Sequence, residues 1–240
     1  SEWIPRSLEL ITESFGMDFT SAANSTIRDI YVQFSNTNDS TLAYVSHSYN
    51  TSTGEAVALT LNVNMHYYNS INTSSEDGAT SSAGAGYLDR TIAHEFTHAV
   101  MAADITWFSA LPTYFKEGMA ELVHGIDDER YSTITKMVNG TSSHTLSSVL
   151  GSNATSNNWG TDEPYAAGYM LLRYLAHQLS GGSVTNVNYV ESFKGNSPGS
   201  IAETAVSMKF DFNGINSVSD LDGEGFSILC GACDQYINIV

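Results

Sequence analysis

Basic side chains are scarce in this chain of 240 residues. Its nine Lys and Arg residues face 26 Asp and Glu residues, which gives a formal net charge of −17. Binding to nucleic acid depends on clusters of Lys and Arg that replace counterions along the phosphates. Since the sequence has no such cluster, no nucleic-acid partner is expected, and the acidity is interpreted as a contribution to solubility.

Long apolar runs and a signal peptide are also missing. No run approaches the roughly 20 apolar residues that a membrane-spanning helix needs, so no membrane insertion is expected. Without the basic and apolar regions of a signal peptide, the sequence predicts a cytosolic protein, a mature fragment, or export by another route. Abundant Ser, Thr, Asn and Gly favour an exported bacterial surface protein. The length allows one large domain or two lobes that share a cleft.

Cysteine is limited to Cys230 and Cys233, which form a single C-x-x-C. A redox motif of this spacing requires a helix N-terminus after a strand. Residues 226–231 and 235–240 instead indicate two short strands around a turn. One pair is also too few for a structural zinc site. We therefore expect a structural pair, either reduced or bridged.

The order of apolar and polar residues predicts both strands and helices. Alternation and β-branched residues predict strands over 29–35, 42–49 and 57–68, and their short polar connections favour antiparallel neighbours. The alternation of Leu59, Leu61, Val63 and Met65 predicts that one face of the sheet packs beneath the helix over 88–103. Helical periodicity and terminal signals predict helices over 7–14, 88–103, 113–124 and 164–179, with one or two more within 186–209.

The helix over 88–103 carries His94, Glu95 and His98 in the pattern H-E-x-x-H. Positions i and i+4 share one face of a helix, so both imidazoles can bind the same ion. Glu95 points about 100° away, where it can contact a water on the metal but is poorly placed as a third ligand. The pattern predicts metal-assisted hydrolysis; the alternative is a surface helix with two solvated histidines.

A catalytic zinc ion usually has three protein ligands and an open fourth position. Asp104 is one candidate, but enzymes that use an acid at this spacing need glycine where this chain has Met101, so Asp104 is expected to be a solvated helix-end residue. Glu117, on the following helix, is the better candidate. Glu121 lies one turn further and is predicted to accept a hydrogen bond from the free ring N–H of a ligand imidazole.

Calcium is a second possible metal. Acidic side chains occur at Glu76 and Asp77 and within the loop over 211–225. These segments lack the regularly spaced ligands of an EF-hand, so solvated loops are the expected interpretation and Ca²⁺ remains the alternative.

The spacing H-E-x-x-H, eighteen residues, then Glu117-Gly-x-Ala resembles the gluzincin metallopeptidases, the clan of thermolysin and of a group of zinc aminopeptidases. In those aminopeptidases a Pro-Tyr-x-x-Gly motif places a tyrosine that stabilises the transition state, and residues 164–168 are similar. The resemblance implies that His94, His98 and Glu117 hold Zn²⁺. It further implies that Glu95 is the general base and that Tyr165 is the oxyanion donor, with Tyr169 as the fallback.

The same resemblance implies an α+β, thermolysin-like zincin fold in a single peptidase domain over 1–240. A small, mostly antiparallel sheet lobe with the H-E-x-x-H helix would occupy about 1–105, a mainly helical lobe about 106–225, and trailing strands 226–240. An extended peptide would lie along an exposed edge of the sheet.

Residues 225–240 are similar to a flagellin segment that usually reads Phe-x-x-Gln-x-Gly-Ala-Asn-x-Gly-x-x-Ile-x-Ile. Together with the zincin motifs they resemble flagellinolysins, flagellins whose variable outer region is replaced by a metallopeptidase domain. Two departures are the cysteines Cys230 and Cys233 and the lack of the long coiled-coil termini of flagellins. The resemblance implies an extracellular enzyme on the surface of a bacterial flagellar filament, with flagellin subunits as partners.

The expected activity is that of a zinc-dependent endopeptidase acting on extracellular proteins. Endopeptidase rather than aminopeptidase activity is expected because the sequence has no G-x-M-E-N-like element to bind a free amine. Two alternatives stay open. One is a structural domain of the filament surface with a non-catalytic zinc ion, and the other is a zinc hydrolase of a non-peptide substrate.

Overall fold

The computed structural model describes residues 3–15, 17–19, 27, 29–72, 74, 78, 80, 86–124, 130–150 and 162–179. The sequence-based expectations that lie outside these residues are the Cys230–Cys233 pair, the strands over 226–240, the helices over 186–209, and the calcium candidates Glu76, Asp77 and 211–225. Within the described part of the chain, no helix combines the length and apolar character that crossing a membrane requires.

Three strands form one small sheet in the order β1-β3-β2. They are β1 (Tyr31–Ser35), β2 (Ala43–Tyr49) and β3 (Ala56–Asn64), so all three predicted strands are present, although β3 ends four residues before its predicted end at residue 68. β2 and β3 are antiparallel, with Val45 opposite Leu61, and a turn that includes Gly54 joins them. The chain is therefore of the mixed α+β class, as predicted.

The first strand does not pair as its short polar connection predicted. β1 pairs with β3 in parallel and does not pair with β2. The reason lies in residues 36–42, which link β1 to β2 and are tied to the end of β3 by the buried Asn64. The Asn64 side chain accepts a hydrogen bond from the Thr37 amide (3.1 Å) and donates to the carbonyls of Thr37 (2.8 Å) and Thr41 (2.9 Å). The expected mostly antiparallel sheet thus has one parallel ladder and one antiparallel ladder.

The described helices include all four that the sequence predicted outside 186–209. The α-helices are α1 (Trp3–Phe15), α2 (Leu88–Asp104), α3 (Thr113–His124), α4 (Tyr131–Val138), α5 (Leu146–Leu150) and α6 (Asp162–Leu179), and the 3₁₀ helix η1 spans Phe108–Ala110. α4 and α5 lie between the helices predicted over 113–124 and 164–179, where the sequence predicted no helix. They are too short to show a repeated apolar stripe; in α4 only Ile134 and Met137 are buried.

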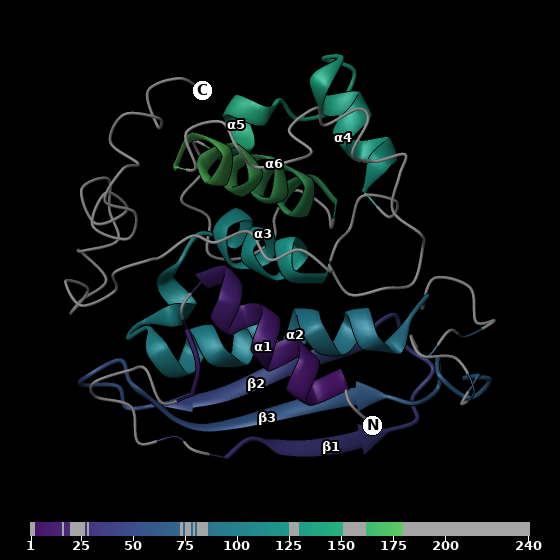
Figure 1. Ribbon diagram of the computed structural model, residues 1–240, viewed down its shortest axis with the longest axis vertical. Helices are drawn as coiled ribbons and strands as arrows, with labels where there is room; N and C mark the ends of the chain where they lie inside the picture. Colours follow the sequence, from purple (N-terminus) through teal and green to yellow (C-terminus); the bar gives the residue numbers. More distant parts are fainter. Residues whose placement is uncertain are drawn as a thin grey trace.

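The elements are stacked in layers (Figure 1). α1 and α2 cover one face of the sheet, α3 follows, and α6 with α4 and α5 lies farthest from the strands. Leu59, Leu61 and Val63 of β3 are buried in clusters that they share with residues of α2 such as Phe96 and Ala99. The prediction that this face of the sheet packs beneath α2 is confirmed, and α2 is held between the sheet and α3.

Candidate metal centre

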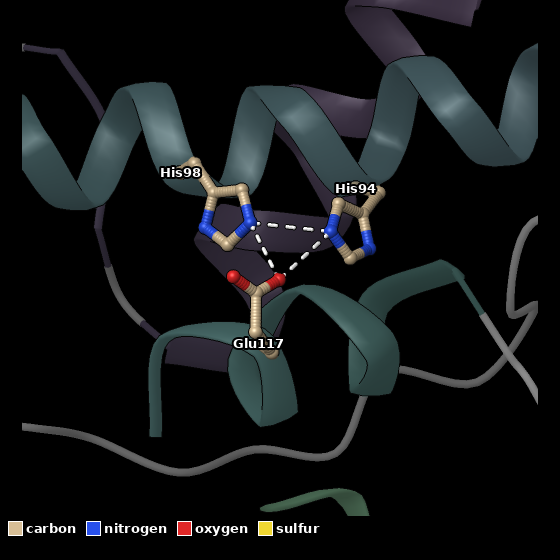
Figure 2. A group of neighbouring side chains, drawn as sticks. All are labelled: His94, His98 and Glu117. Carbon is tan, nitrogen blue, oxygen red and sulfur yellow. Dashed lines mark hydrogen bonds and ion pairs between the residues drawn. The ribbon is translucent and has the colours of Figure 1, made fainter. Parts of the chain in front are cut away.

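Three predicted metal ligands converge between α2 and α3. His94 and His98 lie one turn apart on α2, and their Nε2 atoms are 3.1 Å from each other. Oε2 of Glu117, on α3, is 3.2 Å from Nε2 of His94 and 3.1 Å from Nε2 of His98. Figure 2 shows the three side chains pointing toward one another from the two helices. These three residues, called the metal group below, could hold a metal ion.

Asp104, the rejected candidate, does not join this group. As predicted, α2 continues without a break past Met101, and Asp104 is its last residue. The expectation that Asp104 is solvated is wrong, because it is half-buried. Its neighbours Ala103 and Ile105 are buried, which draws the end of the helix toward the core.

A tight turn brings α3 back against α2. Trp107 has a left-handed backbone with φ of 57°, which is uncommon for a bulky aromatic residue. Its amide donates to the Gly54 carbonyl at 2.9 Å, which anchors the turn on the hairpin between β2 and β3. The chain then passes through η1 and Pro112 and begins α3 at Thr113. This reversal places Glu117 opposite the two histidines.

Glu121 lies where the sequence predicted a hydrogen-bond acceptor. Its carboxylate is fully buried, and Oε1 is 3.3 Å from Nδ1 of His94. When Nδ1–H donates to Glu121, a neutral His94 has a lone pair on Nε2 that faces the Glu117 carboxylate. Two lone pairs at this distance repel each other unless a proton or metal ion lies between them. Nδ1 of His98, by contrast, has no hydrogen-bond partner among the described residues.

The charges of the group favour a cation at its centre. Burial opposes the charge on His94, but Glu117, Glu121 and Glu95 outweigh this effect and raise the pKa of the imidazole to about 10. Burial likewise opposes ionisation of Glu117, yet the imidazoles of His98 and His94 hold the pKa of its carboxyl well below the usual range. His94 and Glu117 therefore stabilise each other's charged forms.

The group lines a cleft of about 250 Å³ together with Glu95 and Tyr165. Ala43, Val45 and His47 of β2 line the same cleft. β2 is an edge strand in the order β1-β3-β2, so one side of its backbone has no partner strand among the described residues. Phe108, in η1, also lines this cleft.

Tyr165 projects from the first turn of α6 to the metal group. Its ring stacks on the His94 imidazole, with centroids 5.8 Å apart and planes 10° apart. Burial and then the charges of Glu117, Glu121 and Glu95 raise the pKa of the Tyr165 phenol far above its ordinary value. The hydroxyl therefore keeps its proton. Tyr169, the fallback candidate, is buried in the core.

Two glycines bring α3 and α6 into backbone contact, and sequence reasoning missed this role. A Cβ on Gly118 would lie 2.5 Å from the carbonyl carbon of Gly168, and a Cβ on Gly168 would overlap the carbonyl oxygen of Tyr114. Gly118 follows Glu117, and Gly168 lies one turn after Tyr165. The glycines of the two motifs thus set how closely the tyrosine approaches the metal group.

Arg130 is a second residue that no motif indicated. Its Nε is 3.3 Å from Oε2 of Glu121, and its Nη1 is 2.9 Å from Oδ1 of Asp162. The guanidinium carbon also lies 5.0 Å from the centroid of the Tyr165 ring. Only an indirect signal in the sequence could have pointed to Arg130. A buried Glu121 requires a cationic partner, and only nine basic residues in the chain could supply one.

Substitution of Gly168 by alanine tests the contact between α3 and α6. The added Cβ meets backbone, which cannot rotate away, so Gly168→Ala should lower the free energy of unfolding by about 3 kcal/mol or more. Gly140→Ala is the matched control, because a Cβ there meets no atom within 4 Å although φ is +68°. It should cost about 1 kcal/mol. Urea denaturation measures the free energy of unfolding of both variants. Equal losses in the two would contradict the close backbone contact between α3 and α6.

The raised pKa of His94 predicts that metal binding depends on pH. Below pH of about 10 this imidazole holds a proton that a metal ion has to displace. Apparent affinity for Zn²⁺ should therefore rise about tenfold per pH unit between about pH 6 and 9 if one proton is released. Competition with a chelator measures the affinity, and titration in buffers of different ionisation enthalpy counts the protons. An affinity that is constant over this range would refute the prediction.

No protein-family model matches the chain, and neither a curated protein nor a solved structure matches it. The chemistry that the cleft supports must therefore be inferred from its own side chains.

Proposed function

We propose that this protein is a zinc-dependent endopeptidase that hydrolyses peptide bonds of extracellular proteins, with a thermolysin-like arrangement of its active centre. One observation carries the proposal. His94, His98 and Glu117 converge within 3.2 Å of one another in a cleft that Glu95 and Tyr165 also line. Ligands, base and hydrogen-bond donor thus lie together, although they come from three different helices.

The donor set fits zinc in a catalytic site. Two imidazoles and one carboxylate, with an open fourth position, are typical of such sites. Ligand atoms bound tetrahedrally at ordinary zinc distances lie about 3.4 Å apart, and the three atoms here are 3.1–3.2 Å apart. Among the described residues, no fourth His, Cys, Asp or Glu belongs to the group. This favours an open catalytic site over a closed structural one in a filament domain.

Glu95 is the proposed general base. A zinc ion held by the three ligands would lower the pKa of a water molecule and polarise the substrate carbonyl. The Glu95 carboxylate, in the same cleft, accepts a proton from the attacking water as its oxygen bonds to the carbonyl carbon. Glu95 then delivers this proton to the amine nitrogen as the C–N bond breaks. Water is consumed, and the carboxylate is restored.

Tyr165 is the proposed donor to the developing oxyanion. Its raised pKa keeps the phenol protonated, so that the hydroxyl can donate a hydrogen bond when the carbonyl oxygen becomes negative. The stacked His94 ring fixes the direction of the side chain before substrate binds. Such preorganisation is the main source of this kind of stabilisation, because no group has to reorient during the reaction.

The edge of β2 favours a peptide as the substrate. Ala43, Tyr44 and Val45 line the cleft from this edge strand. An extended peptide can pair with a strand edge through main-chain hydrogen bonds, which position the chain without requiring a particular sequence. This observation favours a peptidase over a zinc hydrolase of a non-peptide substrate. The absence of a G-x-M-E-N-like element from the sequence favours cleavage within a chain.

The proposed location is the surface of a bacterial flagellar filament, with flagellin subunits as neighbours. This part of the proposal is supported by the sequence of residues 225–240 alone, since they lie outside the described structure. Substrates would then be proteins that the filament meets outside the cell.

Glu95→Gln tests the proposed base. The amide cannot accept the proton, so peptide cleavage should fall by about 10²–10⁴-fold while the zinc content stays near one ion per chain. Digestion of a peptide library measured by mass spectrometry gives the activity, and elemental analysis gives the zinc content. Glu9→Gln, at an exposed site on α1, should cleave like the wild type. Full activity of Glu95→Gln, or none in zinc-loaded wild type, would refute the proposal.

Tyr165→Phe tests the proposed oxyanion donor. Loss of the hydroxyl should lower kcat by about 10²–10³-fold, with KM within about twofold, because the bond forms only as charge develops. Tyr169→Phe is the control, since this tyrosine lies in the core one turn further along α6. Steady-state kinetics on one fluorogenic peptide give kcat and KM for both variants. If Tyr169→Phe loses kcat and Tyr165→Phe does not, the donor has been assigned to the wrong tyrosine.

A further inference from the structure

Arg130 contacts two parts of the site that the proposed mechanism uses separately. On one side, Nε and Nη2 approach the two carboxylate oxygens of Glu121, at 3.3 Å and 3.4 Å. On the other, the guanidinium carbon lies 5.0 Å from the centre of the Tyr165 ring. Arg130 immediately precedes α4 and belongs neither to α3 nor to α6. Its side chain therefore connects the helix of Glu121 with the helix of Tyr165.

These contacts link four side chains in a closed ring of contacts. Nδ1 of His94 is 3.3 Å from Glu121, Glu121 binds Arg130, Arg130 lies against Tyr165, and Tyr165 stacks on His94. Only a planar cation with several donors can bind both oxygens of a carboxylate and lie against an aromatic ring together. An ammonium group is a compact point charge and cannot make both contacts in this geometry.

Each contact of Arg130 has a physical consequence. Glu121 is fully buried, and a buried carboxylate without a cation is strongly unfavourable. Arg130 binds both oxygens of Glu121 and so holds this carboxylate in place beside Nδ1 of His94. The hydrogen bond of Arg130 to Asp162, at 2.9 Å, holds the first turn of α6, from which Tyr165 projects. The Gly118–Gly168 contact fixes α6 only one turn later.

We propose that Arg130 is a positioning residue of the active centre, which holds the Tyr165 ring against His94 and the Glu121 carboxylate beside Nδ1 of His94. This inference rests on the proposed peptidase function. Arg130 touches neither the metal ligand atoms nor the reacting bond; it acts through Tyr165 and Glu121. Its loss should therefore affect the transition state more than substrate binding.

Kinetics of Arg130→Gln, alone and combined with Tyr165→Phe, test the part that acts through the tyrosine. Arg130→Gln should lower kcat by about 10–100-fold with KM within about twofold, because a misplaced donor costs transition-state stabilisation. In the Tyr165→Phe background the same change should cost less than about threefold, because effects of residues that act together are not additive. If Arg130→Gln lowers kcat by the same factor with Tyr165 and with Phe at this position, Arg130 does not position Tyr165.

Milder substitutions guard against a variant that fails to fold. Arg130→Lys keeps the charge and should recover part, but not all, of the lost kcat. Asp162→Asn weakens the outer contact of Arg130, at a half-exposed carboxylate that also accepts a hydrogen bond from Thr133, and should lower kcat about two- to fivefold. Arg6→Gln, at an exposed arginine on α1, is the control and should match the wild type. Wild-type kcat in both Arg130→Lys and Asp162→Asn would overturn the inference.

Binding of a phosphinic peptide separates this inference from the proposed function. Such a peptide carries a tetrahedral oxyanion and needs no turnover, so calorimetry on the zinc-loaded protein can be done even if the wild type cleaves nothing. Arg130→Gln and Tyr165→Phe should each weaken binding at least about tenfold, and the double variant little further. If the wild type cleaves peptides and Arg130→Gln has unchanged kcat and unchanged binding, the role of Arg130 is refuted while the peptidase function stands. If the wild type is inactive but shows the expected binding pattern, the proposed peptidase function is refuted while the role of Arg130 stands.

Discussion

The close approach of three ligand atoms between α2 and α3 is the constraint on which the rest of the site depends. These atoms of His94, His98 and Glu117 face one another at 3.1–3.2 Å, and their lone pairs repel unless protons or a metal ion lie between them. Around this point Glu95 and Glu121 add further negative charge. The acids and imidazoles are mostly buried, so the charge is held in a medium that strengthens each interaction.

Backbone geometry brings these charges together. The left-handed Trp107 reverses the chain after α2, and the glycines Gly118 and Gly168 allow α3 and α6 to touch. Tyr165 thereby reaches the metal group from a helix that lies in a different layer from the sheet (Figure 1). Arg130 then joins the outer helices to the buried Glu121. The ligand atoms come from α2 and α3, but the surrounding geometry depends on α6 and on the turn before α4.

Sequence alone predicted the parts of the site that follow from local periodicity. Helix spacing was enough to place His94 and His98 on one face, and the apolar alternation of β3 identified the sheet face beneath α2. The pairing of β1 was missed because it depends on Asn64, whose hydrogen bonds to residues 36–42 have no local sequence signature. Arg130 was missed for the same reason, since its partners lie on α3 and α6.

X-ray absorption at the zinc edge of the loaded protein tests the central claim most directly, because it reports which atoms surround the metal ion. We expect two imidazole nitrogens and carboxylate oxygen at about 2.0–2.2 Å, with one further light atom that an added hydroxamate replaces. Sulfur scattering at about 2.3 Å would place Cys230 or Cys233 on the metal. That result, or four protein ligands that hydroxamate leaves unchanged, would contradict an open catalytic site made by His94, His98 and Glu117.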